Sequence, residues 1–298
     1  MTRASTTPPA ARIATHPGGF HADDVFAVAV LRLVHGPLEV RRTRDPEALA
    51  AASFRVDVGG RFDAATGDFD HHQRAGAGAR PNGIRYASFG RVWDAFGVEL
   101  AGAEAAARAI DERLVQGVDA NDTGQTIATA LVEGIRPLSV SGAIAAFNPQ
   151  WDEEADEDAR FLDAVTWATG VLERELAGAR AYRRALSLVH DAVARAADPR
   201  VIELDRKLPW HETVVETAPA ALFVIYPKSD GWALMAVPRV LGEFANRRDL
   251  PAAWAGRSGA ELAAVTGVPD ALFAHTKRFY ASAASRAGVL ALARLAVE

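Results

Sequence analysis

The 298-residue sequence predicts an α/β protein with a smaller α+β domain at its C-terminal end. Short strand candidates alternate with segments of helical period in the first two-thirds of the chain, which is the pattern of a mostly parallel sheet. Near residue 198 the pattern changes to closely spaced strand candidates. We therefore expect a disordered arm at 1–11, a first domain at 12–197 with a helical insertion at about 136–195, and a second domain at 198–298.

The first domain opens with a strand candidate at 12–15. A helix is expected from residue 22 to about 34, with Asp23 and Asp24 in its first turn. Further strand candidates lie at 38–44, 54–60 and 67–72, and further helices begin near 45 and cover 86–97, 103–117 and much of 121–195. The stretch "AGAGARPNG" at 75–83 is rich in glycine and predicts a mobile loop.

The second domain is predicted from two apolar runs that flank "PKSDG", the pattern of a β-hairpin. An apolar helix is expected at about 284–297. Such a helix packs either within its own chain or at a homodimer interface, and the sequence leaves both possibilities open.

The composition limits the chemistry of the chain. Hydrophobic residues make up 49% and charged residues 24%, an ordinary balance for a globular protein. The formal net charge of −5 gives no overall attraction to nucleic acid, so binding of that kind would need a local basic patch. The absence of cysteine excludes disulfides, thiolate metal sites and cysteine nucleophiles. Any metal ion must therefore be held by His, Asp or Glu.

The sequence also bears on location. No run approaches the ~20 apolar residues of a membrane-spanning helix, so no membrane partner is expected. The opening "MTRASTTPPAAR" has no apolar core of the secretory type, which predicts a disordered arm rather than a signal peptide. We expect a cytoplasmic protein.

Acidic residues and histidines gather where the predicted strands end. Five of the eight histidines fall within the first 72 residues. The four clusters are "THPGGFHADD" with His16, His21, Asp23 and Asp24, "VDVGG" with Asp57, "DFDHHQ" with Asp70, His71 and His72, and "VDANDTG" with Asp119 and Asp122. Because the carboxyl ends of parallel strands share one edge of a sheet, these clusters are expected to converge.

Each cluster has a simpler structural explanation when it is taken alone. A histidine pair is common at a strand end, and acids favour a helix N-terminus. Their joint occurrence instead favours divalent ions, because neutral imidazoles and ionised carboxylates are suitable ligands at pH 7. Two such ions about 3.5–4 Å apart clamp the attacking and leaving oxygens of a phosphoryl displacement.

The clusters, together with "YASFGRVWDAFG", "FNPQW", "LPWHE" and "TGVPDALFAH", resemble the melanocyte-proliferating-gene (MYG-type) family of metal-dependent hydrolases from about residue 12 to 298. That family is similar to the DHH phosphoesterases. The resemblance implies a DHH-like metal-binding catalytic domain at 12–197 and a substrate-binding domain at 198–298. It also implies two divalent metal ions, with Mn²⁺ expected and Mg²⁺, Zn²⁺ or Fe²⁺ compatible.

The resemblance further implies roles for individual residues. The implied metal ligands are His16, His21, Asp23, Asp57, His71 and Asp119. Asp57 would bridge the ions, His72 would touch the scissile phosphate, and Asp70 is expected to orient a neighbouring side chain. Whether Asp24 or Asp122 also binds metal stays open.

The C-terminal region departs from the family. A glycine-rich "GFIGG" often follows a histidine there, whereas this chain has "HTKRFYASAASRAG", without the double glycine. Cationic side chains could contact substrate phosphates instead. The candidates are Lys207, Arg239, His275, Lys277 and Arg278, each of which could equally be a solvated surface charge.

These features favour a metal-dependent phosphodiesterase. The resemblance implies a 3′–5′ exonuclease that acts on RNA or short oligonucleotides. Two alternatives stay open: a small-molecule phosphatase or pyrophosphatase, and a metal-stabilised binding protein without turnover, which would need closed metal coordination.

Overall fold

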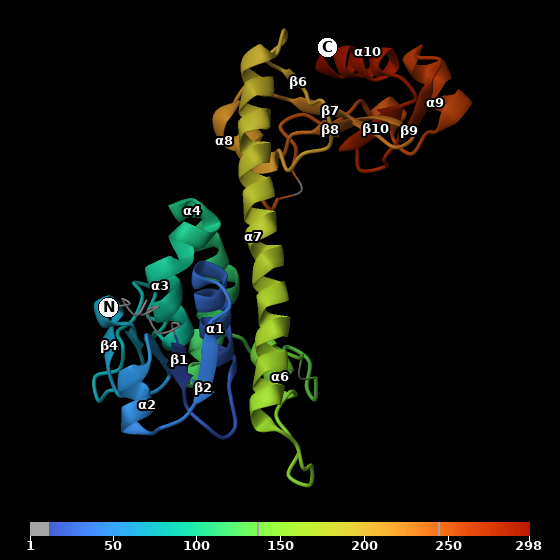
Figure 1. Ribbon diagram of the computed structural model, residues 1–298. Coiled ribbons are helices and arrows are strands. Elements are labelled where there is room, and N and C mark those ends of the chain that lie inside the picture. Colours follow the sequence, from blue (N-terminus) through green and yellow to red (C-terminus); the bar gives the residue numbers. More distant parts are fainter. Residues whose placement is uncertain (1–11, 136, 244) are drawn as a thin grey trace, which may run out of the picture. The chain divides into compact units, whose positions relative to one another are not determined.

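The computed structural model describes residues 12–135, 137–243 and 245–298, so the predicted disordered arm at 1–11 lies outside the described residues. The chain forms two compact units, one up to Arg180 and one from Ala181 onward (Figure 1). The division falls inside a long helix, α7 (Glu157–Arg195). The sequence had placed the domain boundary at 197/198, after this helix, because no break in the helical period marks the change of packing partners.

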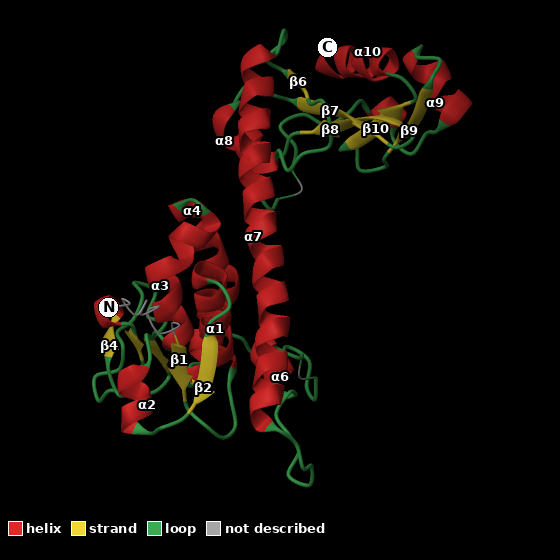
Figure 2. Cartoon of the chain, in the orientation of Figure 1, coloured by secondary structure: helices red, strands yellow, loops and turns green. Residues whose placement is uncertain are grey.

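The N-terminal unit contains a mostly parallel sheet, as the sequence predicted (Figure 2). Its strands follow the order β2-β1-β3-β5-β4, and only the edge strand β4 is antiparallel to its neighbour. Their bounds are β1 (Arg12–Thr15), β2 (Glu39–Arg42), β3 (Phe54–Val56), β4 (Phe62–Asp63) and β5 (Asp68–Phe69). The residues that directly follow the parallel strands therefore lie at one edge of the sheet.

The helices of this unit largely follow the predicted periods. Their bounds are α1 (Ala22–His35), α2 (Pro46–Ala51), η1 (Ala64–Thr66), α3 (Ser88–Ala101), α4 (Glu104–Ile110), η2 (Asp111–Val115), α5 (Gln116–Asp122) and α6 (Val140–Ala145). The predicted helix at 103–117 extends to Asp122 because α4 continues into α5 through the π-helical turn η2. Such π-turns shift the register of the residues that follow and are frequent at functional sites.

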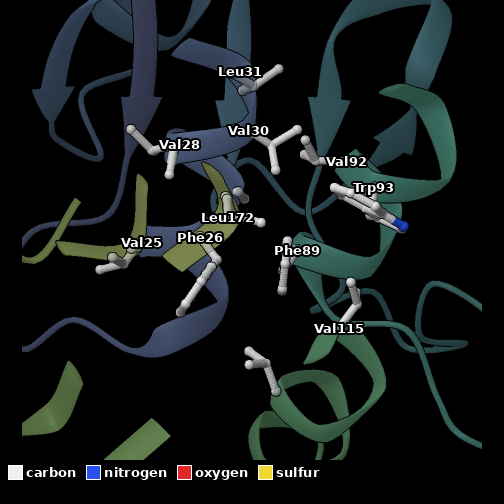
Figure 3. Close-up of a cluster of buried hydrophobic side chains, with 14 of the residues drawn as sticks. Val25, Phe26, Val28, Val30, Leu31, Phe89, Val92, Trp93, Val115 and Leu172 are labelled. Carbon is white, nitrogen blue, oxygen red and sulfur yellow. The ribbon is translucent and has the colours of Figure 1, made fainter. Parts of the chain in front are cut away.

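Helix α1 is the centre of the N-terminal core (Figure 3). Every residue from Ala22 to Leu31 is buried, so the helix is covered on all sides rather than along one stripe. Phe26 stacks on Phe89 of α3 with ring centroids 5.1 Å apart. The apolar composition of α1 therefore reflects its central position between the sheet and the neighbouring helices.

The first half of α7 belongs to the same core. Phe161, Ala164, Val165, Ala168 and Leu172 are buried in it, and Leu172 lies beside the α1 side chains in Figure 3. The stretch predicted as a helical insertion contains the helices α6 and α7. The first half of α7 packs against α1 and thus forms part of the core rather than an addition to it.

The C-terminal unit is an α+β sandwich, also as predicted. Its strand order is β6-β7-β8-β10-β9, with only β6 parallel to its neighbour. The elements are β6 (Val201–Glu203), α8 (His211–Thr217), β7 (Phe223–Lys228), β8 (Gly231–Ala236), η3 (Ala252–Trp254), α9 (Gly259–Thr266), β9 (Ala271–Ala274), β10 (Tyr280–Ala283) and α10 (Arg286–Val297). The predicted hairpin is β7–β8.

Both faces of this sheet are covered, as the four consecutive buried residues at the start of β7 show. Phe223 and Ile225 of β7 pack into the cluster that contains Leu262 of α9 and Leu292 of α10. The intervening Val224 packs on the opposite face, in a cluster with the end of α7 and with α8. The final helix thus packs within its own chain. In the described ranges no helix is both long and apolar enough to cross a membrane.

The packing of α7 leads to a stability prediction. Leu172→Ala should lower the free energy of unfolding of the N-terminal unit by about 2–5 kcal/mol, because Leu172 is 0% exposed and its loss leaves a cavity against α1. The matched control Leu162→Ala, on the same helix but 41% exposed, should cost less than about 1 kcal/mol. Denaturant-dependent hydrogen exchange of α1 measures both effects. Equally small effects of the two substitutions would show that the first half of α7 does not stabilise the N-terminal core.

Candidate metal centre

The candidate site lies where the order of the N-terminal strands reverses. From β1 the chain crosses to β2 on one side and then to β3 on the other, so the loops after β1 and β3 diverge and leave room for a ligand. His16 directly follows β1, Asp57 follows β3, and Asp70 and His71 follow β5. The parallel strand ends therefore bring three of the four predicted clusters to one edge.

Asp57 contacts three histidines. One carboxylate oxygen lies 3.3 Å from His16 Nε2, and the other lies 3.2 Å from both His71 Nε2 and His72 Nδ1. Its φ of 53° is left-handed, a conformation that costs a non-glycine residue about 1 kcal/mol or more and persists where its surroundings enforce it. Burial acts to raise the pKa of Asp57, but the hydrogen bonds from His16 and His71 outweigh it and lower that pKa below its usual range.

The start of α1 supplies the next acidic residue, Asp24. Its Oδ1 accepts hydrogen bonds from the backbone N–H groups of His21 and Val25 at 3.0 and 2.8 Å. Its Oδ2 lies 3.3 Å from His16 Nε2. The hydrogen bond with Asp24, followed by that with Asp57, raises the pKa of His16 to about 10. Asp24, which the sequence left open, therefore lies against His16.

Asp122, the last residue of α5, completes the other side of the cluster. Its carboxylate lies 3.0 Å from His71 Nε2 and 3.6 Å from His21 Nδ1. Asp23 Oδ2 lies 3.9 Å from the same His71 nitrogen. Burial raises the pKa of Asp23, and the nearby carboxylates of Asp57 and Asp122 raise it further. This crowding of carboxylates calls for positive charge between them.

Unpaired buried atoms point to the same need. Among the described residues, both buried carboxylate oxygens of Asp23 lack a hydrogen bond of normal geometry. Oδ2 of Asp24 and Nε2 of His71 also lack one and have only the ion-pair neighbours given above. Burying such groups without a partner is costly, and metal coordination is one way to compensate them. The side chains therefore fit a cation that accepts both oxygen and nitrogen ligands.

The potential ligand atoms form overlapping groups. Each group places one atom from each of three side chains within 4.8 Å of the others. The groups are His16, His21 and Asp57; Asp57, His71 and His72; and His21, Asp23 and Asp122. Because the groups share Asp57 and His21, they fit adjacent ions. Imidazole and carboxylate ligands suit Mn²⁺, Zn²⁺, Fe²⁺ or Mg²⁺.

Asp70 holds His72 in place. Its Oδ1 accepts a hydrogen bond from the His72 backbone at 3.0 Å and lies 2.8 Å from His72 Nδ1, while its Oδ2 accepts one from Gly60 N–H at 2.6 Å. The His72 side chain is 63% exposed. Asp70 therefore lies where it would orient His72, and its role stays a prediction.

The structure does not bring Asp119 to this cluster. Its fully buried carboxylate pairs with Arg80 Nη1 at 2.8 Å and accepts the Gly90 N–H at 2.9 Å. Asp122 lies one helical turn later on α5 and faces the histidines instead. The resemblance had named Asp119 as a metal ligand and left Asp122 open. The spacing of the two aspartates alone does not show which of them faces the sheet edge.

One neighbour of the cluster was missed in the sequence. Ser88, the first residue of α3, is buried and its hydroxyl donates to Asp57 Oδ1 at 3.3 Å. A serine at a predicted helix start is normally explained as a cap. Only the approach of α3 to the end of β3 reveals this contact.

Four of the predicted substrate-binding residues lie close together within the C-terminal unit. Arg278 donates to Asp249 at 2.7 Å, and Asp249 also accepts from Asn246, whose carbonyl accepts from Arg239 Nε at 3.1 Å. His275 lies in the β9–β10 turn beside Arg278, where its Nδ1 accepts the Lys277 backbone N–H at 3.1 Å.

The fifth predicted residue, Lys207, is exposed in the loop between β6 and α8, away from that turn in the sequence. Arg278 has a left-handed φ of 57° at a position near the expected double glycine. The roles of all five residues in substrate binding stay predictions.

The fold and the cluster define an α/β protein whose sheet edge carries a histidine and aspartate site suited to divalent ions. A family model described as "MYG1_exonuc: Uncharacterised protein family (UPF0160)" matches residues 12–297. The chain belongs to this family.

Relatives of the chain agree with this assignment. The human protein named MYG1 exonuclease is 31% identical over 95% of this chain and 85% of its own length. The MYG1 protein of Chlamydia trachomatis is 34% identical over 90% of each chain. Among solved structures, the pGpG-specific phosphodiesterase PggH of Vibrio cholerae is 12% identical, with a TM-score of 0.33 over 92% of this chain and 93% of that chain, and the family assignment does not rest on it.

The contrast between the two α5 aspartates can be tested directly. Asp122→Asn should weaken Mn²⁺ binding at least tenfold, because it removes a charged oxygen beside His21 and His71. Asp119→Asn should leave Mn²⁺ binding within about twofold but lower the free energy of unfolding by about 3 kcal/mol, because Arg80 loses a buried partner. Isothermal titration and urea denaturation measure the two quantities. Loss of metal binding in the Asp119 variant alone would restore the role predicted from sequence.

Proposed function

We propose that this chain is a metal-dependent phosphodiesterase, a 3′–5′ exonuclease that acts on RNA or short oligonucleotides and uses two divalent ions, Mn²⁺ being the expected one. The observation that carries the proposal is the convergence of overlapping ligand groups on Asp57 and His21 at the strand edge. The name of the human relative and the resemblance of "DFDHHQ" to the DHH phosphoesterases support the same activity.

The residues that would hold the ions are His16, His21, Asp23, Asp57, His71 and Asp122. When bound, a pair of divalent ions lowers the pKa of a coordinated water and stabilises the charge on phosphoryl oxygens. Asp57 has one oxygen toward His16 and the other toward His71, which suits a carboxylate shared by the two positions. Asp24 and Ser88 would hold His16 and Asp57 in place.

His72 is suited to act on the substrate. Its Nδ1 lies 2.8 Å from Asp70 and 3.2 Å from Asp57, and because carboxylates accept hydrogen bonds, Nδ1 is the nitrogen that carries the proton. Nε2 is then the nitrogen left for a phosphate oxygen or for proton transfer at the leaving oxygen. Its exposed ring makes this contact possible, while Asp70 fixes the orientation.

The first test is hydrolysis by protein that has been stripped of metal and then supplied with Mn²⁺. End-labelled single-stranded RNA should lose nucleotides one at a time from its 3′ end, and 5′ and 3′ labels distinguish this from the opposite polarity. Release of phosphate from small substrates or pyrophosphate alone would favour the phosphatase alternative. Tight Mn²⁺ binding without any hydrolysis would favour a binding protein.

Substitutions in the histidine pair should separate metal binding from chemistry. His71→Ala should lose both Mn²⁺ binding and activity. His72→Ala should keep most Mn²⁺ binding but lower kcat by roughly 10²–10⁴-fold, the usual contribution of a positioned proton donor. Asp70→Asn should lower kcat by roughly 10-fold or more, because the ring loses its orienting carboxylate.

The matched control is His190→Ala, an exposed histidine of α7 outside the cluster. Its kcat and Mn²⁺ binding should stay at the wild-type level. A His72 variant with full kcat would remove that residue from the mechanism.

A further inference from the structure

A cavity of about 370 Å³ opens beside His71, next to the candidate metal centre. It is lined by residues 75–79 of the glycine-rich stretch and by His71, Arg85, Tyr86 and Thr123. This volume is in the range of small-ligand pockets. None of the roles assigned above uses it.

The glycine-rich lining is anchored, although the sequence predicted a mobile loop. Ala79 pairs with Arg85 in an antiparallel bridge, with Tyr86 N–H donating to the Gly78 carbonyl at 3.0 Å. Gln125, just beyond α5, accepts the Arg85 backbone N–H at 2.8 Å and donates to the Gly83 carbonyl at 3.0 Å. The segment is therefore a hairpin held against the end of α5.

This hairpin offers unpaired hydrogen-bond donors. Within the described residues, the backbone N–H groups of Ala77, Gly78 and Ala79 have no acceptor. Gly76 and Gly78 have left-handed φ values of 64° and 88°. Alternation of left-handed and ordinary residues turns successive N–H groups toward a common side, which creates a concave site for an anion.

Arg85 adds a positive charge to the same cavity. Its Nη2 donates to the Thr123 carbonyl, and no carboxylate in the described part of the chain lies within ion-pair distance of it. The aspartates of the neighbouring centre are directed to the histidines. The guanidinium thus keeps donors for an oxyanion, which it can bind more strongly than a neutral donor would.

We propose that this cavity binds the phosphate on the 5′ side of the scissile diester, a proposal that rests on the exonuclease function above. The residues 75–79 and Arg85 would hold the retained strand while the terminal nucleotide lies over the metal centre. The ligand class is an oligonucleotide with at least one phosphate beyond the bond that is cleaved. A dinucleotide with a 5′-phosphate, pApA, has this group, and ApA lacks it.

The test compares equilibrium binding of fluorescently labelled pApA and ApA in EDTA, where metal-dependent turnover cannot occur. The wild-type protein should bind pApA at least about tenfold more tightly, the scale of a charge-assisted contact. Arg85→Ala should reduce this ratio to about one. Arg174→Ala, an exposed arginine of α7 outside the cavity, should keep the wild-type ratio.

Two substitutions of Ala79, one charged and one neutral, make the test independent of the Arg85 contact with Thr123. Ala79→Glu should abolish the preference for pApA by repulsion, whereas Ala79→Gln, of nearly the same size, should retain most of it. Equal ratios in these two variants, or an unchanged ratio in Arg85→Ala, would overturn the proposal, as would a wild-type protein that binds pApA and ApA alike.

Hydrolysis of bis(p-nitrophenyl) phosphate with Mn²⁺ separates this proposal from the proposed function, because that diester has no second phosphate. If the wild-type protein hydrolyses this diester but binds pApA and ApA alike, the phosphate site in the cavity is contradicted and the exonuclease function is not. A clear preference for pApA without hydrolysis of any diester would support the cavity as a nucleotide phosphate site and contradict the exonuclease function.

Discussion

The buried carboxylate of Asp57 is the constraint on which the candidate site depends. A carboxylate at the end of a central strand must be compensated, because an unpaired charge is strongly disfavoured in the interior. Here His16 and His71, from the two neighbouring strand ends, and the exposed His72 supply that compensation. The left-handed backbone at Asp57 and the two glycines that follow turn the chain away at once, which keeps the side chain directed at the sheet edge.

The candidate site also depends on the rigid start of α1. Ten successive residues of this helix are buried, so its position is set by the sheet, α3 and α7 rather than by solvent. Its first turn nevertheless carries Asp23 and Asp24, which the positive end of the helix dipole favours. The same element is therefore the centre of the hydrophobic core and the support of two acidic side chains. Packing changes far along α1 should be felt at the site for this reason.

The sequence predicted the parts of the site that follow strand ends. His16 and Asp57 come directly after strands and His71 follows a strand after one intervening residue, and the geometry of a parallel sheet is enough to bring them together. It did not predict the choice between Asp119 and Asp122, because both lie on one helix and the face presented depends on the π-turn η2, for which the residues at 111–115 show no local signal. The domain boundary was missed for a similar reason, since α7 changes its packing partners without a break in its helical period.

The end of α5 joins three parts of the N-terminal unit. Asp119 holds Arg80 and the start of α3, Asp122 reaches His71 and His21, and the Thr123 carbonyl accepts from Arg85 in the hairpin. Because these contacts arise within about one helical turn, the candidate metal ligands and the cavity are mechanically coupled. A buried ion pair at the first of these positions is weak evidence for stability in general, but here it holds the Asp119 face of α5 against Arg80 rather than against the histidines. The register of one short helix thus links the arrangement of charge at the centre to the position of the phosphate that we place beside it.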